Sequence, residues 1–404
     1  MATPKIRVAI IGAGLTGLLT AHGLKKNGFD VVVFEREKTH GERRRDWSIL
    51  LHWGMPMFTK LLPESTIERL PEAICNPHLT FDEYVESIRA VNGKTGEQVF
   101  RNPTPGARRI TRQRLRTVLL RDLEEAGVIR WGQRLVNIEA GESGPVKLAF
   151  EDGSTHEADY VLGADGASSK VRELLFKGNE SAKVQYSGFM FASVVAKYGD
   201  AEKVETFEKS HPVTTILFGE DSVGGFGTMH ADSPDDKSQW EMFWVKVWRR
   251  DGLPVPEDTH GQKALEYLKM TTKNWVEPYN TLVQSTPDNA DVHIDHMKVW
   301  TSKPFDNLGG RVTLAGDAGH PMLPYRGQGF QHAILDATKI LDALLKIRDE
   351  GAPASEVITE YDKDMVERGA KAVQQSIKEA ELSMDLKTVN QMLMARKGHG
   401  KDVE

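Results

Sequence analysis

The feature that most constrains this chain is a glycine-rich turn close to its N-terminus. Residues 6–11 (IRVAII) are an apolar, β-branched run typical of a buried strand. Gly12, Gly14 and Gly17 follow in the pattern G-x-G-x-x-G, and apolar residues at helical spacing continue to Gly28. In such a setting the first glycine permits the tight turn and the second lets a pyrophosphate approach the backbone. The third lets the helix lie close to the sheet. The sequence therefore predicts a dinucleotide-binding turn.

A second apolar strand with an acidic end completes the βαβ unit. Residues 31–35 (VVVFE) form this strand, and Glu35 ends it. A carboxylate in this place can accept hydrogen bonds from both hydroxyls of an adenosine ribose. Arg36, the next residue, is a further predicted cofactor contact. The glycine pattern alone does not separate FAD from NAD.

Composition places the chain among soluble globular proteins. Its 404 residues are 39% hydrophobic and 27% charged, and a net charge of −6 leaves no basic excess to hold nucleic acid. Cys75 is the single cysteine, which excludes an intrachain disulfide framework and a multi-cysteine metal site. No apolar run reaches the roughly 18 residues of a spanning helix, and the apolar start lacks a signal peptide's cleavage region. We expect a cytoplasmic protein without a membrane anchor.

The rest of the chain predicts a first domain that is interrupted by antiparallel strands. Between about residues 186 and 250 several strand-like runs are separated by Gly, Asp and Ser, and their apolar and aromatic residues could wall a pocket. We expect Trp244 and Trp248 to be core residues. Further expected elements are a hairpin at 86–101 turned at Asn92-Gly93, a helix at 112–126, a hairpin at 134–162 turned at Asp152-Gly153, a strand at 311–315, and helices at 328–348 and 354–383.

Two later motifs bear on the choice of cofactor. The first is GADGASSKVR at 163–172, and the second is AGDAGHPMLPYRGQGFQHAILDA at 315–337. Together with the glycine turn, and in this order, they resemble the group A FAD-dependent monooxygenases, the aromatic-hydroxylase-like flavoproteins. The resemblance extends from residue 6 to about residue 376. It favours bound FAD, and it is closest to fungal-type members of secondary metabolism.

The resemblance implies an α/β fold in which a Rossmann-like FAD-binding domain carries an inserted antiparallel-sheet substrate domain. The predicted FAD-binding domain is discontinuous, and the oligomeric state is not readable. The predicted divisions are 1–80 with 103–185 and 290–350 for FAD, 81–102 with 186–289 for substrate, 351–395 for C-terminal helices, and 396–404 for a polar tail.

Several residues match cofactor contacts of that family. Asp317 matches an aspartate that contacts FAD, and Gly329 and Phe330 open a helix whose backbone N–H groups can face the flavin. Arg112, in the R-x-x-L of ITRQRL, matches an arginine that helps bind FAD. Asp165 would support both FAD and a transient nicotinamide.

A run of three arginines leaves more than one interpretation open. Arg45, within RRRDW, matches a second cofactor-contacting arginine. The run from Arg43 to Arg45 is otherwise a solvated basic turn, or a contact for the phosphates of NADPH.

The sequence offers no secure catalytic acid or base. Ser193 stands where related chains carry an arginine, and the run SVGGFGTMH offers no matching tyrosine. His52 and Tyr325 are the remaining candidates, although a histidine in this place is more often simply hydrogen-bonded, and a packed loop tyrosine is an equal alternative for Tyr325. No metal site is predicted, because His293 and His296 lack a third ligand.

The resemblance also implies a reaction. In the family, NADPH or NADH reduces FAD, and O2 then adds to give a C4a-hydroperoxide that transfers one oxygen to an electron-rich carbon. The implied substrate is an apolar aromatic or polycyclic small molecule, with hydroxylation, epoxidation and indole oxidation all open. Two other readings remain: a flavin-dependent reductase or dehydrogenase without oxygen transfer, and a binding or scaffold protein that has lost the chemistry.

Overall fold

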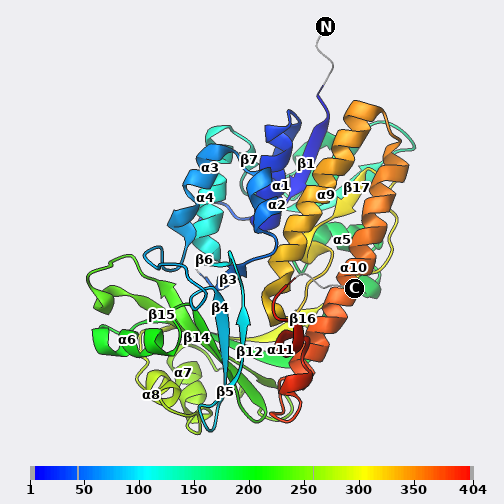
Figure 1. Ribbon diagram of the computed structural model, residues 1–404. Coiled ribbons are helices and arrows are strands. Elements are labelled where there is room, and N and C mark those ends of the chain that lie inside the picture. The colour runs from blue at the N-terminus through cyan, green and yellow to red at the C-terminus, as the bar shows by residue number, and fades with distance from the viewer. Residues whose placement is uncertain (1–4, 43–44, 258, 401–404) are drawn as a thin grey trace.

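The computed structural model describes residues 5–42, 45–257 and 259–400. Its elements form two parts, which lie one above the other in Figure 1. The upper part is a parallel sheet with helices against it, and the lower part is a larger, mainly antiparallel sheet. The helices α9 (Gln328–Glu350) and α10 (Ala354–Leu382) run side by side along the upper part, and α10 continues down to the lower one.

The upper sheet contains the strands that the sequence predicts for the cofactor unit. All its neighbouring strands are parallel. Their order is β17 (Val312–Leu314), β11 (Tyr160–Gly163), β1 (Arg7–Ile11), β2 (Asp30–Phe34) and β7 (Ile129–Arg130). The strand–turn–helix prediction is confirmed, because α1 (Leu15–Lys26) follows β1 directly.

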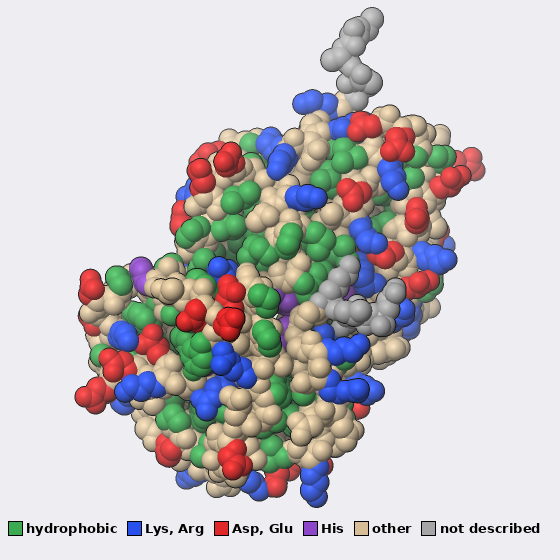
Figure 2. Space-filling model, in the orientation of Figure 1, with side chains coloured by type: hydrophobic (Ala, Val, Ile, Leu, Met, Phe, Trp, Pro, Cys, Tyr) green, Lys and Arg blue, Asp and Glu red, His purple; other side chains and the backbone are tan. Residues whose placement is uncertain are grey.

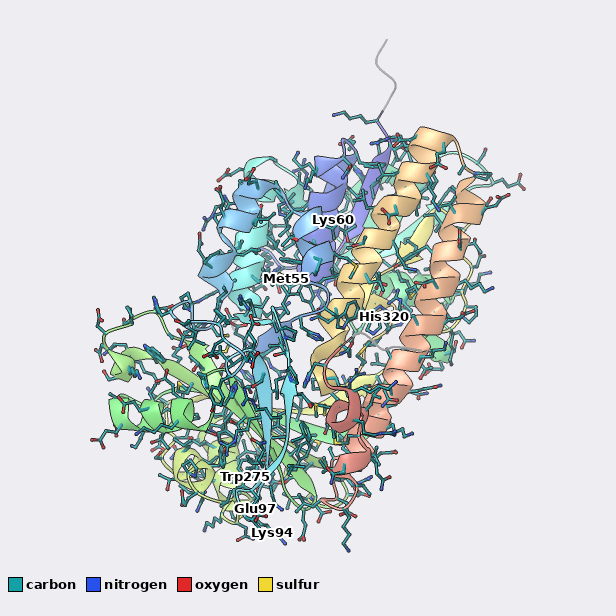
Figure 3. All side chains as sticks on the ribbon, viewed as in Figure 1. Met55, Lys60, Lys94, Glu97, Trp275 and His320 are labelled. Atoms are coloured by element: carbon teal, nitrogen blue, oxygen red, sulfur yellow. The ribbon has the colours of Figure 1, made fainter. Side chains whose placement is uncertain are left out.

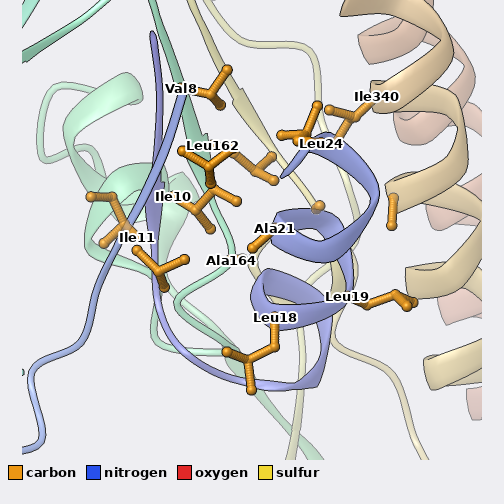
Figure 4. Packing of buried hydrophobic residues seen from close by; sticks show 14 of the residues in the cluster. Val8, Ile10, Ile11, Leu18, Leu19, Ala21, Leu24, Leu162, Ala164 and Ile340 are labelled. Carbon is orange, nitrogen blue, oxygen red and sulfur yellow. The ribbon is translucent and has the colours of Figure 1, made fainter. Parts of the chain in front are cut away.

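Apolar side chains hold the upper part together. Figure 4 shows Ile10 of β1 and Leu162 of β11 facing Ala21 of α1, with Leu24 of α1 beside Ile340 of α9. All five side chains are at most 2% exposed. The helices predicted at 112–126, 328–348 and 354–383 are confirmed by α4 (Arg112–Glu125), α9 and α10.

The remaining helices are shorter. They are α2 (Met55–Leu61), α3 (Glu64–Glu68), α5 (Lys170–Leu175), α6 (Ala201–Ser210), α7 (Gly261–Met270), α8 (Tyr279–Gln284) and α11 (Leu393–Lys397). Among the described residues, no helix is long and apolar enough to cross a membrane.

The lower sheet has seven strands and takes them from distant parts of the chain. β4 pairs in parallel with β13, and every other neighbouring pair is antiparallel. The order is β16 (Asp291–Val299), β12 (Gln185–Lys197), β15 (Glu241–Arg249), β14 (Ser222–His230), β13 (Thr214–Phe218), β4 (Ser87–Asn92) and β5 (Gln98–Pro103).

Two details of the sequence prediction are wrong in this sheet. The boundary at residue 290 assigned β16 to the cofactor part, whereas β16 pairs along β12 as an edge strand of the lower sheet. The β4–β5 hairpin is confirmed, but it turns over residues 93–97. The Asn92 side chain accepts the backbone N–H of Lys94, and Gly96 takes the positive φ that the turn needs. The Gly93 oxygen of this turn accepts the backbone N–H of Val276 at 2.8 Å, so the turn lies beside the 275–276 segment, where Figure 3 labels Lys94, Glu97 and Trp275.

Two smaller sheets complete the fold. The antiparallel pair β3 (Ser48–Leu51) and β6 (Arg108–Thr111) lies between the upper and lower parts. β8 (Leu135–Ala140), β9 (Val146–Phe150) and β10 (Thr155–Ala158) form a three-stranded sheet, so the region predicted as one hairpin holds an additional strand. Its predicted Asp152-Gly153 turn is confirmed, since Gly153 has a φ of 84°.

Strand alternation gives the lower sheet two distinct faces. In β15, Phe243, Val245 and Val247 face a cavity, while Trp244 and Trp248 face the opposite side and pack in a core with α7 and α8. Both tryptophans are 1% exposed, which confirms that they are core residues. The sheet therefore serves as a cavity floor on one face and as a folding core on the other.

A buried lysine interrupts that core. Lys246 is 2% exposed, and its Nζ donates to the backbone oxygen and the hydroxyl of Thr271, both at 2.9 Å. Burial lowers the pKa of Lys246 from 10.5 to about 8. The charged form is therefore less favourable in the folded state than in the unfolded chain.

We predict that the free energy of unfolding increases by about 2 to 3 kcal/mol between pH 7 and pH 10 because of Lys246. The burial penalty is fully present below pH 8, and it is relieved as the pH rises through 8 toward 10.5, where the lysine of the unfolded chain also loses its proton. Urea unfolding at both pH values should show this increase in the wild type relative to Lys246→Met. An equal pH dependence in both proteins would contradict the prediction.

Candidate active site

A cavity of about 480 Å³ lies between the upper and lower sheets. Figure 2 shows histidine side chains in the recess where the two parts meet. From above, it is lined by residues that follow the carboxyl ends of β1, β11 and β17, the edge at which parallel sheets bind ligands. From below, the lining comes from alternate residues of β12, β13 and β15. One space thus joins the glycine turn to the apolar face of the lower sheet.

The three positions of the turn carry glycine for different physical reasons. A Cβ on Gly12 would lie 2.5 Å from the Ala164 oxygen, and one on Gly17 would lie 2.0 Å from the Gly12 oxygen. Gly12 also has a φ of 107°. A Cβ on Gly14 would meet nothing within 4 Å, and Gly14 lines the cavity. Gly12 and Gly17 are required by the fold itself, whereas Gly14 keeps open a space that a ligand can use.

Glu35 supports the turn from beneath. Its carboxylate accepts the backbone N–H groups of Ala13 at 2.8 Å and Glu37 at 3.0 Å. Arg116 is 2% exposed and donates to the Ala13 oxygen and to the Glu37 carboxylate, both at 2.8 Å. The contact of Glu35 with a ribose stays a prediction, as does that of Arg36, which is exposed. Sequence reasoning missed Arg116, although its spacing of four residues from Arg112 places both on one helix face.

The two predicted cofactor arginines lie in different surroundings. Arg112 lines the cavity, donates its backbone N–H to the Trp47 oxygen at 3.0 Å, and holds its guanidinium carbon 4.8 Å from the Trp47 ring centroid. Arg45 pairs with Asp295 of β16 at 2.6 Å, so it connects the 45–47 segment to the lower sheet. Arg43 lies outside the described residues, as does Arg44. Cofactor contacts by Arg45 and Arg112 stay predictions.

The Asp165 motif joins two loops. The Asp165 carboxylate accepts the Ser169 hydroxyl at 2.5 Å and the Lys170 N–H at 2.6 Å, which fixes the start of α5. Arg172 is 1% exposed and donates to the Ala318 oxygen at 2.8 Å, in the loop after β17. A direct role of Asp165 in cofactor binding stays a prediction, although its neighbours Ala164 and Gly166 line the cavity.

Asp317 presents a carboxylate to the cavity. Its side chain is exposed there, and it makes no hydrogen bond to any described residue. The surrounding protein raises the pKa of Asp317, and the positive charges of Arg112 and Arg172 oppose this rise. An unpaired acceptor in such a place fits the hydroxyl groups of a ribityl chain, and the contact of Asp317 with FAD stays a prediction.

The predicted helix start after β17 is confirmed. Gly327 takes a left-handed conformation with a φ of 61°, and α9 begins at Gln328. Gly329 and Phe330 lie in the first turn of α9 and line the cavity. The N-terminal N–H groups and the helix dipole favour negative charge, which suits the pyrimidine edge of a flavin.

A buried carboxylate clamps this loop to both long helices. Asp336 of α9 is fully buried and accepts the Gly316 N–H at 2.8 Å, His320 Nε2 at 2.7 Å and Arg368 Nη2 at 2.6 Å. Figure 3 shows His320 at the level of α9 and α10. The positive groups hold the pKa of Asp336 well below its usual range despite burial. Sequence reasoning missed this set, and its only signal was an aspartate within the buried stretch 331–337 of α9.

The two predicted catalytic candidates are occupied by protein contacts. His52 Nε2 lies 3.3 Å from the Gly327 oxygen, and burial lowers the pKa of His52 to about 4, so the ring is neutral at pH 7. The Tyr325 ring lines the cavity, but its hydroxyl lies 2.9 Å from the Ser383 hydroxyl, and burial raises its pKa. The structure does not bring the two together as an acid–base pair. A catalytic role for either residue stays a prediction.

The segment predicted as a polar tail contributes to the cavity wall. Met394 and His399 line the cavity, and His399 is 5% exposed. Arg326 donates from Nε to the Gly398 oxygen and from Nη2 to the Gly400 oxygen, both at 3.0 Å. The predicted polar tail at 396–404 is polar in sequence, and Arg396, Lys397 and Gly400 are exposed, but His399 is buried and Arg326 and Gln328 bind the backbone oxygens of residues 398–400.

The fold and the site define a flavin-binding oxidoreductase with a cavity beside its cofactor loop. A family model described as an FAD binding domain matches residues 5–376. An FAD-dependent monooxygenase of Penicillium herquei, phnB, is 29% identical over 98% of this chain and 96% of its own length. Another, cctM of Talaromyces islandicus, is 30% identical over 92% of this chain and 91% of its own length.

A solved structure shows the same fold. Klebsiella pneumoniae HpxO complexed with FAD and uric acid superimposes with a TM-score of 0.74, at 19% identity, over 98% of this chain and 92% of that chain. The chain belongs to the family of FAD-dependent monooxygenases, with FAD as its cofactor. The predicted family, the aromatic-hydroxylase-like fold and the cofactor FAD are confirmed.

We predict that Gly14→Ala and Gly17→Ala separate cofactor binding from folding. Gly14→Ala should leave the free energy of unfolding of the FAD-free protein within about 1 kcal/mol of wild type, because its φ of −78° accepts alanine and its Cβ meets no protein atom. Its affinity for FAD should fall at least about tenfold. Gly17→Ala should lower the free energy of unfolding by more than about 3 kcal/mol, because the added Cβ would overlap a backbone oxygen. Urea unfolding and flavin fluorescence titration measure the two effects, and wild-type FAD affinity in Gly14→Ala would contradict the prediction.

We predict that Asp336→Asn lowers the free energy of unfolding by about 3 to 5 kcal/mol, because it leaves Arg368 without its buried counter-charge and weakens the contact with His320. The matched control is Asp364→Asn, which removes a half-exposed partner of the same arginine and should cost less than about 1 kcal/mol. Urea unfolding of both variants checks the difference. A similar decrease in the free energy of unfolding of both variants would show that Asp336 is not the central contact.

Proposed function

We propose that this monooxygenase takes electrons from NADPH or NADH and inserts one oxygen atom of O2 into an apolar aromatic or polycyclic small molecule, by hydroxylation or epoxidation. One observation carries the proposal. The cofactor loop and the apolar face of the lower sheet line a single cavity, so a substrate on the sheet lies within reach of a cofactor held by the loop.

The residues around the upper part of the cavity fit FAD. Gly14 leaves space beside the start of α1, Asp317 offers an unpaired carboxylate, and the first turn of α9 offers backbone N–H groups. FAD, when bound, supplies the redox and oxygen chemistry of the reaction. Arg112 would hold the cofactor from the side of α4. The Asp336 contacts keep the 316–320 loop in place, which fixes where Asp317 points.

The lower part of the cavity fits an apolar ring system. Phe191, Ile216, Phe218 and Val247 lie on the cavity face of the sheet, and Met394 of the C-terminal segment lies on the wall. Such a lining excludes water, which protects a reactive oxygen species from decay. HpxO, of the same fold, is solved with uric acid bound, which supports a small-molecule substrate. No described histidine offers a base with an ordinary pKa at this lining, so chemistry that needs no base remains open.

We predict that substrate binding accelerates oxidation of NADPH or NADH by the FAD-loaded protein. The assay uses indole, 2-naphthol and a hydroxyanthraquinone as probes, under isotopically labelled O2, with catalase-sensitive peroxide measured in parallel. A supporting result is accelerated oxidation with a product that carries one labelled oxygen atom. Asp306→Ala, an exposed loop aspartate, serves as a control for Asp317→Ala, which should lose FAD.

Two results would contradict the proposal. A flavin that neither nucleotide reduces, with every probe present, would exclude the proposed electron source. Rapid nucleotide oxidation with peroxide as the only product, over a panel extended to larger polycyclic compounds, would favour a reductase without oxygen transfer.

A further inference from the structure

The wall of the cavity contains a cation that no acidic residue balances. Arg109 lies on β6, in the small sheet between the upper and lower parts, and it lines the cavity. Its guanidinium carbon is 5.4 Å from the centroid of the Phe243 ring, so the side chain reaches the floor formed by β15. From there Val245 and Val247 continue along the same face of that strand.

The hydrogen bonds of Arg109 leave one edge of its guanidinium without a partner. Nη1 donates to the Ser48 hydroxyl at 2.9 Å, while Nε is buried without any partner. No described residue accepts a hydrogen bond from Nη2, and no described carboxylate lies within 4.0 Å of the group. Nε is out of reach of solvent, so Nη2 is the donor that a ligand in the cavity can reach, and a carboxylate oxygen is a strong acceptor for it.

Neighbouring arginines of the same segment do not share this property. Arg108 pairs with Glu86 at 2.8 Å, Arg114 with Asp232 at 2.6 Å, and Arg116 with Glu37 at 2.8 Å. The segment thus places an acid opposite each of these three arginines, and no described acid lies within 4.0 Å of Arg109. Arg112 also lines the cavity, but its guanidinium lies against the Trp47 ring, and it is the predicted cofactor contact. An unbalanced charge removed from water is costly unless a ligand compensates it.

The titratable groups around Arg109 do not compensate its charge. Burial raises the pKa of the Cys75 thiol to about 12, so the thiol is neutral at pH 7. Burial lowers the pKa of His211 to about 4 and that of His399 to about 3, so both rings are neutral as well. Arg109 itself keeps its proton, because a guanidinium remains charged even when burial lowers its pKa. Arg109 therefore places an uncompensated positive charge beside the apolar floor of the cavity.

We propose that Arg109 binds a carboxylate of the substrate and thereby selects aromatic acids, with the ring lying on the Phe243–Val245–Val247 floor. The inference rests on the proposed function, which it narrows from apolar aromatic compounds to those that carry an acidic group. Arg109 is a specificity-determining residue in this account, and the FAD contacts lie elsewhere in the cavity.

The test compares two probes of equal size on the FAD-loaded protein: 2-naphthoate, which is anionic, and 2-naphthamide, which is neutral. Dissociation constants come from the change in flavin absorbance or fluorescence on titration. Wild type should bind 2-naphthoate about tenfold to a hundredfold more tightly than 2-naphthamide. Arg109→Met keeps an apolar stem and removes the charge, so it should abolish this preference while binding 2-naphthamide as wild type does.

Two further variants sharpen the comparison. Arg109→Lys keeps the charge without the forked geometry and should retain part of the preference. Arg114→Met removes a nearby arginine that pairs with Asp232 outside the cavity, and it should leave the preference unchanged. If Arg109→Met does not fold, the ratio of the two dissociation constants in wild type and in Arg109→Lys still tests the inference.

Several results would overturn the inference. Equal binding of the two probes by wild type would do so, as would an undiminished preference in Arg109→Met. Loss of FAD from Arg109→Met at normal folded stability would show that the arginine holds the cofactor instead. Reduction of the flavin by NADPH or NADH is followed in the same samples. Its failure in wild type would count against the proposed function, whereas a normal reduction with no anion preference would count against Arg109 alone.

Discussion

The Asp336 carboxylate is the contact on which the site depends. It sits on α9, but its partners come from the loop after β17 and from α10, so one buried charge fixes three elements relative to one another. A buried carboxylate is tolerable when donors satisfy both of its oxygens, and here the Gly316 N–H and His320 Nε2 bond one oxygen while Arg368 bonds the other. A shift of the 316–320 loop would therefore remove two of the three hydrogen bonds to this carboxylate. Rigid placement of Asp317 at the cavity follows from this.

Local sequence patterns predict the cofactor half well, because its constraints are local. The β1–α1 turn needs Gly12 and Gly17 for reasons that involve atoms only a few residues away or on the adjoining strand. The long helices α9 and α10 follow from apolar spacing alone. The wrong boundary at residue 290 has a different origin. β16 pairs with β12, which lies about a hundred residues earlier in the chain. The alternation of polar and apolar residues within β16 does not indicate which of the two sheets the strand joins.

The site is harder to predict, because its chemistry depends on partners from distant segments. Arg109 and Arg114 are both arginines of one short segment, and only the fold shows that one meets Asp232 while the other faces the cavity without an acid. In the same way the polar residues near 398 resemble a solvated end until Arg326 and Gln328 are seen to bind their backbone oxygens. Tyr325 is at the cavity as predicted, yet Ser383 engages its hydroxyl. The pattern of polar residues indicates which chemistry is available, but the contacts that each residue makes in the fold decide its role.

The parallel pairing of β4 with β13 has a consequence for how the chain reaches its native state. β4 and β5 are synthesised before much of the cofactor part, yet they complete a sheet whose other strands follow about a hundred residues later. Pairings of such long sequence separation form slowly, since a large loop must close before they gain any contact. Neither half can therefore finish folding as an autonomous fragment. A single proteolytic cut between the halves should leave two pieces that remain associated under native conditions and cannot be prepared separately.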